Sequence, residues 1–326
     1  MSGDFLILGL NEIGASIGLA LAEAGLEADR IGFDPDDIVA REAQEMGAVD
    51  RLAKRPGRAA AEADLVLLNL AADETQEYMK SIGRRLKAGT VVLNTSPNSQ
   101  LAINWAAESL PEGCHYVGIT LVVGPQALGR TSDHAPQPQP DLYKGGLIGI
   151  GMPPGAEEAA VNAATNLARI LGASPFFLDP SEIDGMMTAL DGLPSLLALA
   201  LMHTTAQSPA WRDMQRLAGA KFANATAPGM QVFPKALTAT LIENRQRLIP
   251  RLDAVMAVLQ DLRHLLTQED QDDLVAFIEE TQKARGAWIA ARHRDDWERE
   301  EITGVQAAKR GSLDQMLGFD IGRPRE

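Results

Sequence analysis

Short apolar runs alternate with stretches of helical spacing through the first half of the chain. Runs such as 5–8 and 64–70 are typical of strands buried on both faces of a parallel sheet. Between them, apolar residues recur every three or four positions, as in 156–171. Strands that alternate with helices predict an α/β domain with a Rossmann-type doubly wound parallel sheet over residues 1–179. The predicted strands are 5–8, 30–34, 64–70, 91–94, 116–123, 147–151 and 174–178.

From about Asp179 onward the pattern is helical, with almost no strand signal. Residues 244–266 carry more apolar positions at helical spacing than one small bundle needs to cover, which favours a homodimer. We therefore expect an all-helical dimerisation and substrate domain over 180–308 and a C-terminal tail over 309–326. The predicted helices are 181–205, 210–218, 235–265 and 268–297.

Charge and cysteine content limit the classes of partner. The 326 residues carry a formal net charge of −14, which argues against nucleic acid and anionic membranes, because both need clustered positive charge. A single cysteine, Cys114, rules out an internal disulfide framework and favours a reducing compartment. The sequence shows no signal peptide, no apolar run of roughly 18 residues and no metal-ligand spacing. We expect a cytoplasmic protein with a small-molecule substrate and no metal.

The segment from Gly9 to Gly14 has the context of a dinucleotide-binding fingerprint. It follows a buried strand and opens a helix, whose free N–H groups and positive dipole end can hold a diphosphate. Gly9 suits the tight turn and Gly14 the close packing of helix on strand, but Asn11 replaces the middle glycine. Asparagine tolerates left-handed backbone angles, so the turn can form. The Asn11 side chain must then point away from the phosphates or bond to them.

Asp34 ends the second predicted strand, where a carboxylate is expected to accept hydrogen bonds from the adenosine ribose. Asp36 and Asp37 follow, and no basic residue precedes Arg41, so a 2′-phosphate would meet negative charge. NAD is therefore favoured over NADP. A Rossmann-like domain whose site has decayed is the alternative. The predicted coenzyme-binding residues are Gly9, Asn11, Glu12, Ile13, Gly14, Asp34, Leu70 and Thr95.

The order of these pieces resembles the prephenate dehydrogenase family over roughly residues 5–292. The resemblance implies an N-terminal dinucleotide domain, an all-helical dimerisation domain and hydride transfer to NAD or NADP. The segments that carry it are 7–17, 63–70, 116–118, Leu193-Pro194 and 243–245.

The catalytic motifs of that family are altered here at four places. Thr120 stands where the family's Gly-His-Pro segment has the histidine that takes the proton from the substrate hydroxyl. The family's Asp-x-x-Ser segment reads Asn-Thr-Ser-Pro at 94–97, and its Ser-His-Leu-Pro-His motif reads Asp-Gly-Leu-Pro-Ser at 191–195. The arginine expected to hold a substrate carboxylate falls near Ala227. A threonine hydroxyl is not a base near neutral pH without an activating group, so the resemblance implies the family's fold with different chemistry.

Polar residues on one face of the apolar helix 181–205 are candidate replacements: Asp184, Thr188, Asp191 and Ser195. The resemblance places this helix at the interdomain cleft, beside the nicotinamide. Asp191 could then act as a general base or bind a cationic group, and Ser195 could contact the substrate. A solvent-facing polar stripe is the alternative.

Two further pairs of residues complete the candidate set. Lys221 and Asn224 form a Lys-x-x-Asn pair similar to that of the β-hydroxyacid dehydrogenases, in which the lysine is the acid/base. Because the pair lies later in this chain, a Lys221 that holds an anionic group or stays solvated is favoured over a catalytic one. Thr95 and Ser96 resemble that family's Ser-Thr segment and are expected near the nicotinamide. The predicted catalytic residues are Asp191, Thr120 and Ser96, and the predicted substrate-binding residues are Ser195 and Lys221.

These observations favour a prephenate-dehydrogenase-like NAD(P)-dependent oxidoreductase that acts on a small polar substrate other than prephenate. Two alternatives stay open. One is a genuine prephenate or arogenate dehydrogenase with a divergent site, and the other is a non-catalytic homodimer that binds a dinucleotide.

Overall fold

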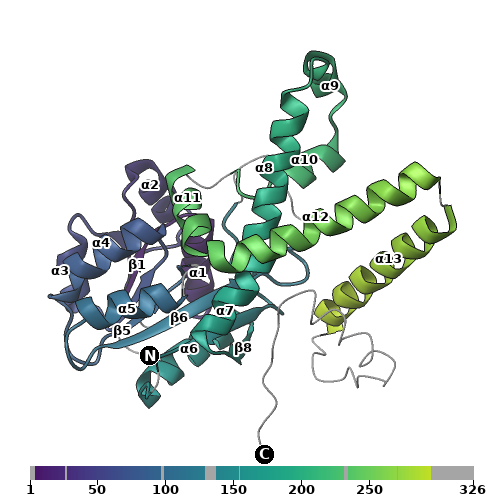
Figure 1. The fold of residues 1–326 in the computed structure, drawn as a ribbon. Helices are drawn as coiled ribbons and strands as arrows, with labels where there is room; N and C mark the ends of the chain where they lie inside the picture. The colour runs from purple at the N-terminus through teal and green to yellow at the C-terminus, as the bar shows by residue number, and fades with distance from the viewer. Residues whose placement is uncertain are drawn as a thin grey trace, which may run out of the picture.

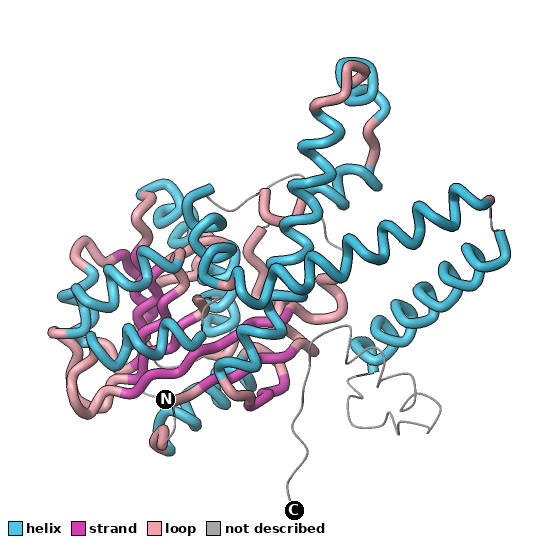
Figure 2. Tube along the Cα trace, viewed as in Figure 1, coloured by secondary structure: helices cyan, strands magenta, loops and turns pink. Residues whose placement is uncertain are grey.

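The computed structural model describes residues 4–25, 28–96, 99–128, 137–153, 155–230, 234–269 and 271–294. Residues 295–308 of the expected helical domain and the expected tail 309–326 lie outside this description. Figures 1 and 2 show a sheet flanked by helices in the N-terminal part, followed by helices alone. The predicted fold class, a Rossmann-type sheet followed by a helical region, is confirmed.

The described residues form an eight-stranded sheet in the order β3-β2-β1-β4-β5-β6-β7-β8. The strand order reverses at β1, so the carboxyl ends of β1 and β4 flank the crevice where open α/β sheets bind ligands. The strands are β1 (Phe5–Leu8), β2 (Arg30–Phe33), β3 (Arg51–Leu52), β4 (Leu65–Leu68), β5 (Val91–Asn94), β6 (His115–Val122), β7 (Leu147–Gly151) and β8 (Ser174–Phe177).

The all-parallel prediction is wrong for β7 and β8. β7 pairs antiparallel with β6, and β8 is parallel to β7, so both run opposite to the other strands. A parallel neighbour needs a long crossover, usually helical. The described part of the β6–β7 connection contains no helix, which agrees with an antiparallel return. β3, which is not among the predicted strands, is a two-residue strand at Arg51–Leu52.

Side chains of β1 explain its continuous apolar run. Phe5 and Ile7 pack into the core on one face of the sheet, which α1, α2 and α6 cover, whereas Leu6 and Leu8 pack into the core on the other face, under α3, α4 and α5. The helices are α1 (Glu12–Glu23), α2 (Asp37–Glu45), α3 (Pro56–Glu62), α4 (Ala72–Gly83), α5 (Ser99–Ser109) and α6 (Glu158–Ile170).

The helical region differs from the predicted helices in three details. The segment expected as one helix over 181–205 contains a π-helical turn, η1, and the helix expected over 235–265 breaks at Asn244. Helix α10 was not predicted. The helices are α7 (Pro180–Met187), η1 (Thr188–Gly192), α8 (Leu193–Ala206), α9 (Trp211–Leu217), α10 (Ala220–Thr226), α11 (Pro234–Glu243), α12 (Arg245–Gln268) and α13 (Gln271–Arg294). In Figure 1, α12 and α13 form an antiparallel hairpin that extends away from the sheet.

Helices α8 and α12 expose much of their apolar surface. Leu201 and Leu259 are 42% and 56% exposed, and Leu190 in η1 is 72% exposed. Among the described residues, the stretch Pro180–Ala206 is long and apolar enough to pass a test for a membrane-spanning helix by length and composition alone. Asp184 within this stretch is hydrogen bonded to the sheet domain, so we interpret the exposed apolar side chains as a protein-contact surface.

Candidate functional site

The turn between β1 and α1 can be built only with glycine at two positions. Gly9 has φ +93°, and a Cβ there would lie 1.9 Å from the Asn69 carbonyl oxygen. A Cβ on Gly14 would lie 1.9 Å from the Gly9 carbonyl oxygen. Both contacts are too short for any side chain, so the glycines bring the start of α1 directly against the carboxyl ends of β1 and β4. The N-terminus of α1 therefore lies at the crevice.

The Asn11 side chain caps this helix. Its Oδ1 accepts hydrogen bonds from the N–H groups of Ile13 at 3.0 Å and Gly14 at 3.4 Å. Asn69, which follows β4 and is 4% exposed, donates from Nδ2 to the same oxygen at 2.7 Å and to the Gly9 carbonyl at 3.2 Å. Asn11 therefore takes neither of the two orientations expected from the sequence, because its side chain lies over the first-turn amides themselves.

Asp34 lies where the fingerprint requires a carboxylate, just beyond β2. Its Oδ2 accepts from the Leu10 N–H at 2.7 Å and its Oδ1 from the Asp36 N–H at 2.9 Å, so two backbone groups fix its orientation. Nearby, burial raises the pKa of Tyr78, and the charges of Glu74, Glu77 and Asp34 raise it further. Two further carboxylates, those of Glu74 and Glu77, thus lie close enough to Tyr78 to act on it together with Asp34.

Thr95 and Ser96 follow β5 at the same edge of the sheet. The Thr95 hydroxyl donates to Asn69 Oδ1 at 2.8 Å, which ties the end of β5 to the Asn11 cap. Ser96 is 5% exposed, and its Oγ has no hydrogen-bond partner among the described residues. A buried hydroxyl without a partner is costly, so it fits a place where a ligand supplies the missing bond.

Glu12 and Leu70 flank the turn. Burial raises the pKa of Glu12, which begins α1. Leu70 follows β4, and its Cδ2 would lie 3.1 Å from a Cβ on Gly9. Both predicted coenzyme residues therefore lie next to the Gly9–Gly14 turn.

Thr120 lies on β6, two residues beyond Gly118, which pairs with the last residue of β5. It pairs with Gly149 of β7 and is half-buried. Within the described part of the chain its hydroxyl makes no hydrogen bond, so none of the described residues activates Thr120 as a base.

The polar face of helix 181–205 joins the two parts of the chain. Asp184 is 5% exposed, and its two carboxylate oxygens accept from the N–H groups of Ser99 at 2.7 Å and Gln100 at 3.1 Å. It therefore caps α5 from α7. Thr188 and Ser195 donate to carbonyl oxygens one turn earlier, those of Asp184 and Asp191, at 2.6 and 2.9 Å.

Asp191 is the remaining member of this face. The residue as a whole is exposed, yet the protein around its carboxyl group desolvates it and raises its pKa. It borders a small cavity of about 20 Å³, beside Asp184, Thr188, Thr240 and Asn244. This volume holds about one water-sized group. The structure thus brings Asp191 together with Asp184, Thr188 and the α11–α12 junction.

The basic side chains of Lys221 and Arg292 differ in how deeply they are buried. Lys221 is exposed on α10, which packs against α8, and Figure 1 shows both helices extending away from the sheet. Arg292, near the end of α13, was not singled out in the sequence. It is 4% exposed and donates from Nη2 to the Val123 carbonyl just beyond β6. Nothing local in the sequence marks Arg292, since its partner lies 169 residues away.

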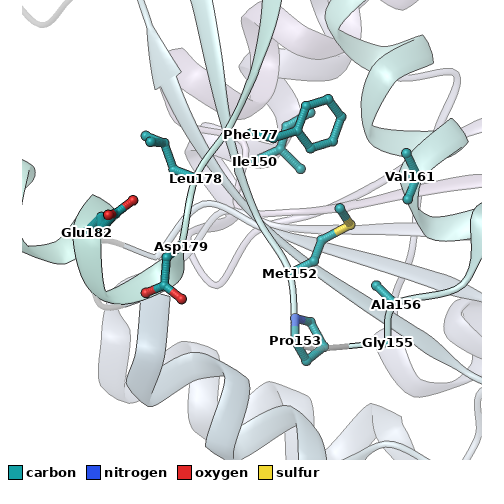
Figure 3. A pocket seen from close by; sticks show the side chains of 10 residues that line it. All are labelled: Ile150, Met152, Pro153, Gly155, Ala156, Val161, Phe177, Leu178, Asp179 and Glu182. Atoms are coloured by element: carbon teal, nitrogen blue, oxygen red, sulfur yellow. The ribbon is translucent and has the colours of Figure 1, made fainter. Parts of the chain in front are cut away.

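A larger hollow of about 470 Å³ lies at the ends of β7 and β8 (Figure 3). Its walls are mostly apolar, with Met152 and Phe177 on one side and the carboxylates of Asp179 and Glu182 near the start of α7. The adjoining Glu157 pairs with His115 at the start of β6, at 3.8 Å. The hollow therefore lies toward the amino end of β6, away from the Gly9–Gly14 turn.

The strand order, the glycine turn and the carboxylate after β2 define the chain as a Rossmann-type protein with a helical second region. Residues 179–280 match the family model described as prephenate dehydrogenase, dimerization domain. This domain match and the relatives below make the chain similar to proteins of the prephenate dehydrogenase family.

Three relatives illustrate the similarity. The prephenate dehydrogenase of Bacillus subtilis (strain 168) is 22% identical over 279 residues, covering 85% of this chain and 74% of that protein. The cyclohexadienyl dehydrogenase of Zymomonas mobilis is 21% identical over 282 residues, covering 86% and 94%. The crystal structure of prephenate dehydrogenase from A. aeolicus with hydroxyphenyl propionate and NAD+ superimposes with a TM-score of 0.75 at 18% identity, covering 88% of this chain and 98% of that one.

Proposed function

We propose that the chain is an NAD-dependent oxidoreductase of prephenate-dehydrogenase-like architecture that acts on a small polar substrate other than prephenate. The observation that carries the proposal is the Gly9–Gly14 turn, which puts the start of α1 at the crevice with Asp34 facing it from β2. The relatives are named as dehydrogenases, and the A. aeolicus structure contains NAD+. Both support a dinucleotide coenzyme.

The coenzyme would lie across the crevice between β1 and β4. Asp34 would accept hydrogen bonds from the adenosine ribose, the start of α1 would face the diphosphate, and Thr95 and Ser96 would face the nicotinamide. The carboxylates around Tyr78 support NAD over NADP, because a 2′-phosphate would be repelled there. When bound, such a coenzyme supplies the hydride-transfer chemistry. The Ser96 hydroxyl, buried and without a partner among the described residues, would gain one from the ligand.

The altered motifs support a substrate other than prephenate. Thr120 replaces the family's proton-accepting histidine, and Gly192 and Ser195 replace the two histidines of its substrate motif. Asp191, whose pKa is raised by burial, is the carboxylate nearest in sequence to these positions. We assign it the role of general base or of partner for a cationic substrate group.

We also propose that the chain acts as a homodimer through its helical region. The matched model is a dimerization domain. The apolar surface of α8 and α12, including Leu201 and Leu259, supports the same conclusion, because a second copy would remove it from water.

The test is an absorbance assay of NAD+ and NADP+ reduction with prephenate, arogenate and a panel of small polar alcohols, amines and hydroxy acids. We expect NAD-dependent turnover of a panel member at about 1–1000 per second and none of prephenate. Prephenate oxidation in that range would refute the substrate assignment. If no member of the panel is turned over but the protein binds NADH saturably, the result would favour the second candidate.

The second candidate is a non-catalytic homodimer that binds a dinucleotide. Thr120 favours it, because it stands where the family has its proton-accepting histidine and, among the described residues, its hydroxyl has no base beside it to activate it. Turnover of any substrate that is lost in an Asp191→Asn variant would exclude it.

A further inference from the structure

We propose that Asn11 is an internal competitor for the diphosphate of the coenzyme, so that a dinucleotide binds only after the Asn11 amide leaves the start of α1. This inference rests on the proposed function, because it concerns how that coenzyme enters its site.

The first-turn amides of α1 are largely occupied by Asn11 itself. Asn11 Oδ1 accepts from the N–H groups of Ile13 at 3.0 Å and Gly14 at 3.4 Å. A diphosphate at a helix N-terminus is held by these same unpaired N–H groups. The side-chain oxygen of Asn11 therefore occupies the position that a phosphate oxygen needs.

A buried clamp holds the competing side chain in place. Asn69 Nδ2 donates to Asn11 Oδ1 at 2.7 Å, and the Thr95 hydroxyl donates to Asn69 Oδ1 at 2.8 Å. Because Thr95 supplies a donor to Asn69 Oδ1, the amide of Asn69 is oriented with its nitrogen toward Asn11 and Gly9. The chain of hydrogen bonds runs from the end of β5 through the end of β4 to α1. It links the expected nicotinamide side of the site to the expected diphosphate side.

Asn11 can leave without disturbing the fold. Its side chain is on the exposed surface, and its backbone angles, φ −61° and ψ −174°, are ordinary extended values. Rotation of the side chain alone uncovers the amides of Ile13 and Gly14. The same angles suit glycine, and glycine at an N-cap destabilises a helix by only a few tenths of a kcal/mol. An Asn11→Gly variant is therefore expected to fold and to present free amides.

The size of the effect follows from the bonds that must break. Displacing Asn11 costs the N-cap bonds and the bond from Asn69, together on the order of a tenfold change in affinity. We expect Asn11→Gly to bind NADH and ADP-ribose roughly tenfold more tightly than the wild type. Asn11→Asp keeps an acceptor over the amides and adds a negative charge, so it should bind both ligands more weakly than the wild type. Adenosine has no phosphate, and its affinity should not change.

The experiment is a calorimetric titration of the wild type, Asn11→Gly and Asn11→Asp with NADH, ADP-ribose and adenosine. Asp179→Gly is the matched control, since Asp179 also caps a helix, accepting from the Ser181 N–H at 2.8 Å at the start of α7. It should leave all three affinities unchanged. Far-UV circular dichroism checks that each variant is folded.

The outcomes separate this inference from the proposed function. Equal NADH affinity in the wild type and Asn11→Gly, or weaker binding by Asn11→Gly, would overturn the competitor role while leaving a dinucleotide site in place. Weaker binding would mean that the Asn11 amide donates to the phosphates. If no variant binds NADH or ADP-ribose, the proposed function itself fails. If Asn11→Gly also binds adenosine more tightly than the wild type does, the inference is overturned, because the gain in affinity would not be confined to ligands with a diphosphate.

Discussion

Replacing Asp184 with alanine tests how firmly α7 fixes the start of α5. Its carboxylate is 5% exposed and accepts from the N–H groups of Ser99 at 2.7 Å and Gln100 at 3.1 Å. Each hydrogen bond to a charged group contributes about 1.5–3 kcal/mol, and the positive end of the helix adds to this. Removing the side chain also leaves two amides without an acceptor. We therefore expect Asp184→Ala to lower the free energy of unfolding by about 3–5 kcal/mol.

Two further variants sharpen this prediction. Asp184→Asn keeps one acceptor oxygen, so it should lose about half as much, roughly 2 kcal/mol. Asp191→Ala removes a carboxylate from the same helical segment, but this carboxylate accepts no hydrogen bond from the described residues. It should cost less than about 1 kcal/mol.

Urea unfolding followed by circular dichroism measures these differences, and hydrogen exchange locates them. Exchange of the Ser99 and Gln100 amides should accelerate in Asp184→Ala and stay unchanged in Asp191→Ala. Asp184→Ala would refute the reasoning if it unfolded within 1 kcal/mol of Asp191→Ala and exchanged these amides at the wild-type rate.

Three other predictions follow from single contacts. Gly14→Ala should destabilise the chain by about 3 kcal/mol or more, because its Cβ would lie 1.9 Å from the Gly9 carbonyl oxygen. A Cβ on Gly286 in α13 would have no atom within 4 Å, so Gly286→Ala should stabilise the chain by up to about 1 kcal/mol. Urea unfolding of both variants measures these changes in the free energy of unfolding. Burial raises the pKa of Asp191, so the folded chain binds a proton on this carboxylate more tightly than the unfolded chain does. As the pH rises from about 4 through the raised pKa, the Tm of the wild type should therefore fall relative to that of Asp191→Asn. A difference in Tm that stays constant with pH would contradict the shift. Burial also raises the pKa of Cys114, which donates to the Lys87 carbonyl at 3.3 Å, so a thiol reagent should react slowly at pH 8 and fast in urea.

The parts of the fold that local sequence determines were predictable. The Gly9–Gly14 turn, the apolar runs of β1, β4 and β5 and the acid after β2 each depend on neighbours within a few residues. Their positions in the structure agree with the predicted strands and with the predicted turn. The direction of β7 was not predictable in this way, because an apolar run has the same pattern in a parallel and an antiparallel strand.

The contacts that assemble the site were less accessible to sequence reasoning. Asn69 meets Asn11 across 58 residues, and Asp184 meets Ser99 across 85. No spacing rule connects such pairs, because only the folded sheet and the docked helix bring them together. The stripe containing Asp184 and Asp191 was recognised from its helical spacing, but the role of Asp184 as a cap for α5 depends on tertiary packing. The assignments of Asp191, Thr120, Ser96, Ser195 and Lys221 stay predictions.

A titration of NADH and NADPH into the wild type and Asp34→Ala tests the central claim most directly. That claim is that a dinucleotide binds at the start of α1 with its ribose on Asp34. We predict one saturable NADH site per chain, weaker binding of NADPH, and at least about tenfold weaker NADH binding by Asp34→Ala, the loss expected for removing a charged hydrogen-bond acceptor. Absence of NADH binding at millimolar concentration, or equal affinity in the wild type and Asp34→Ala, would contradict it.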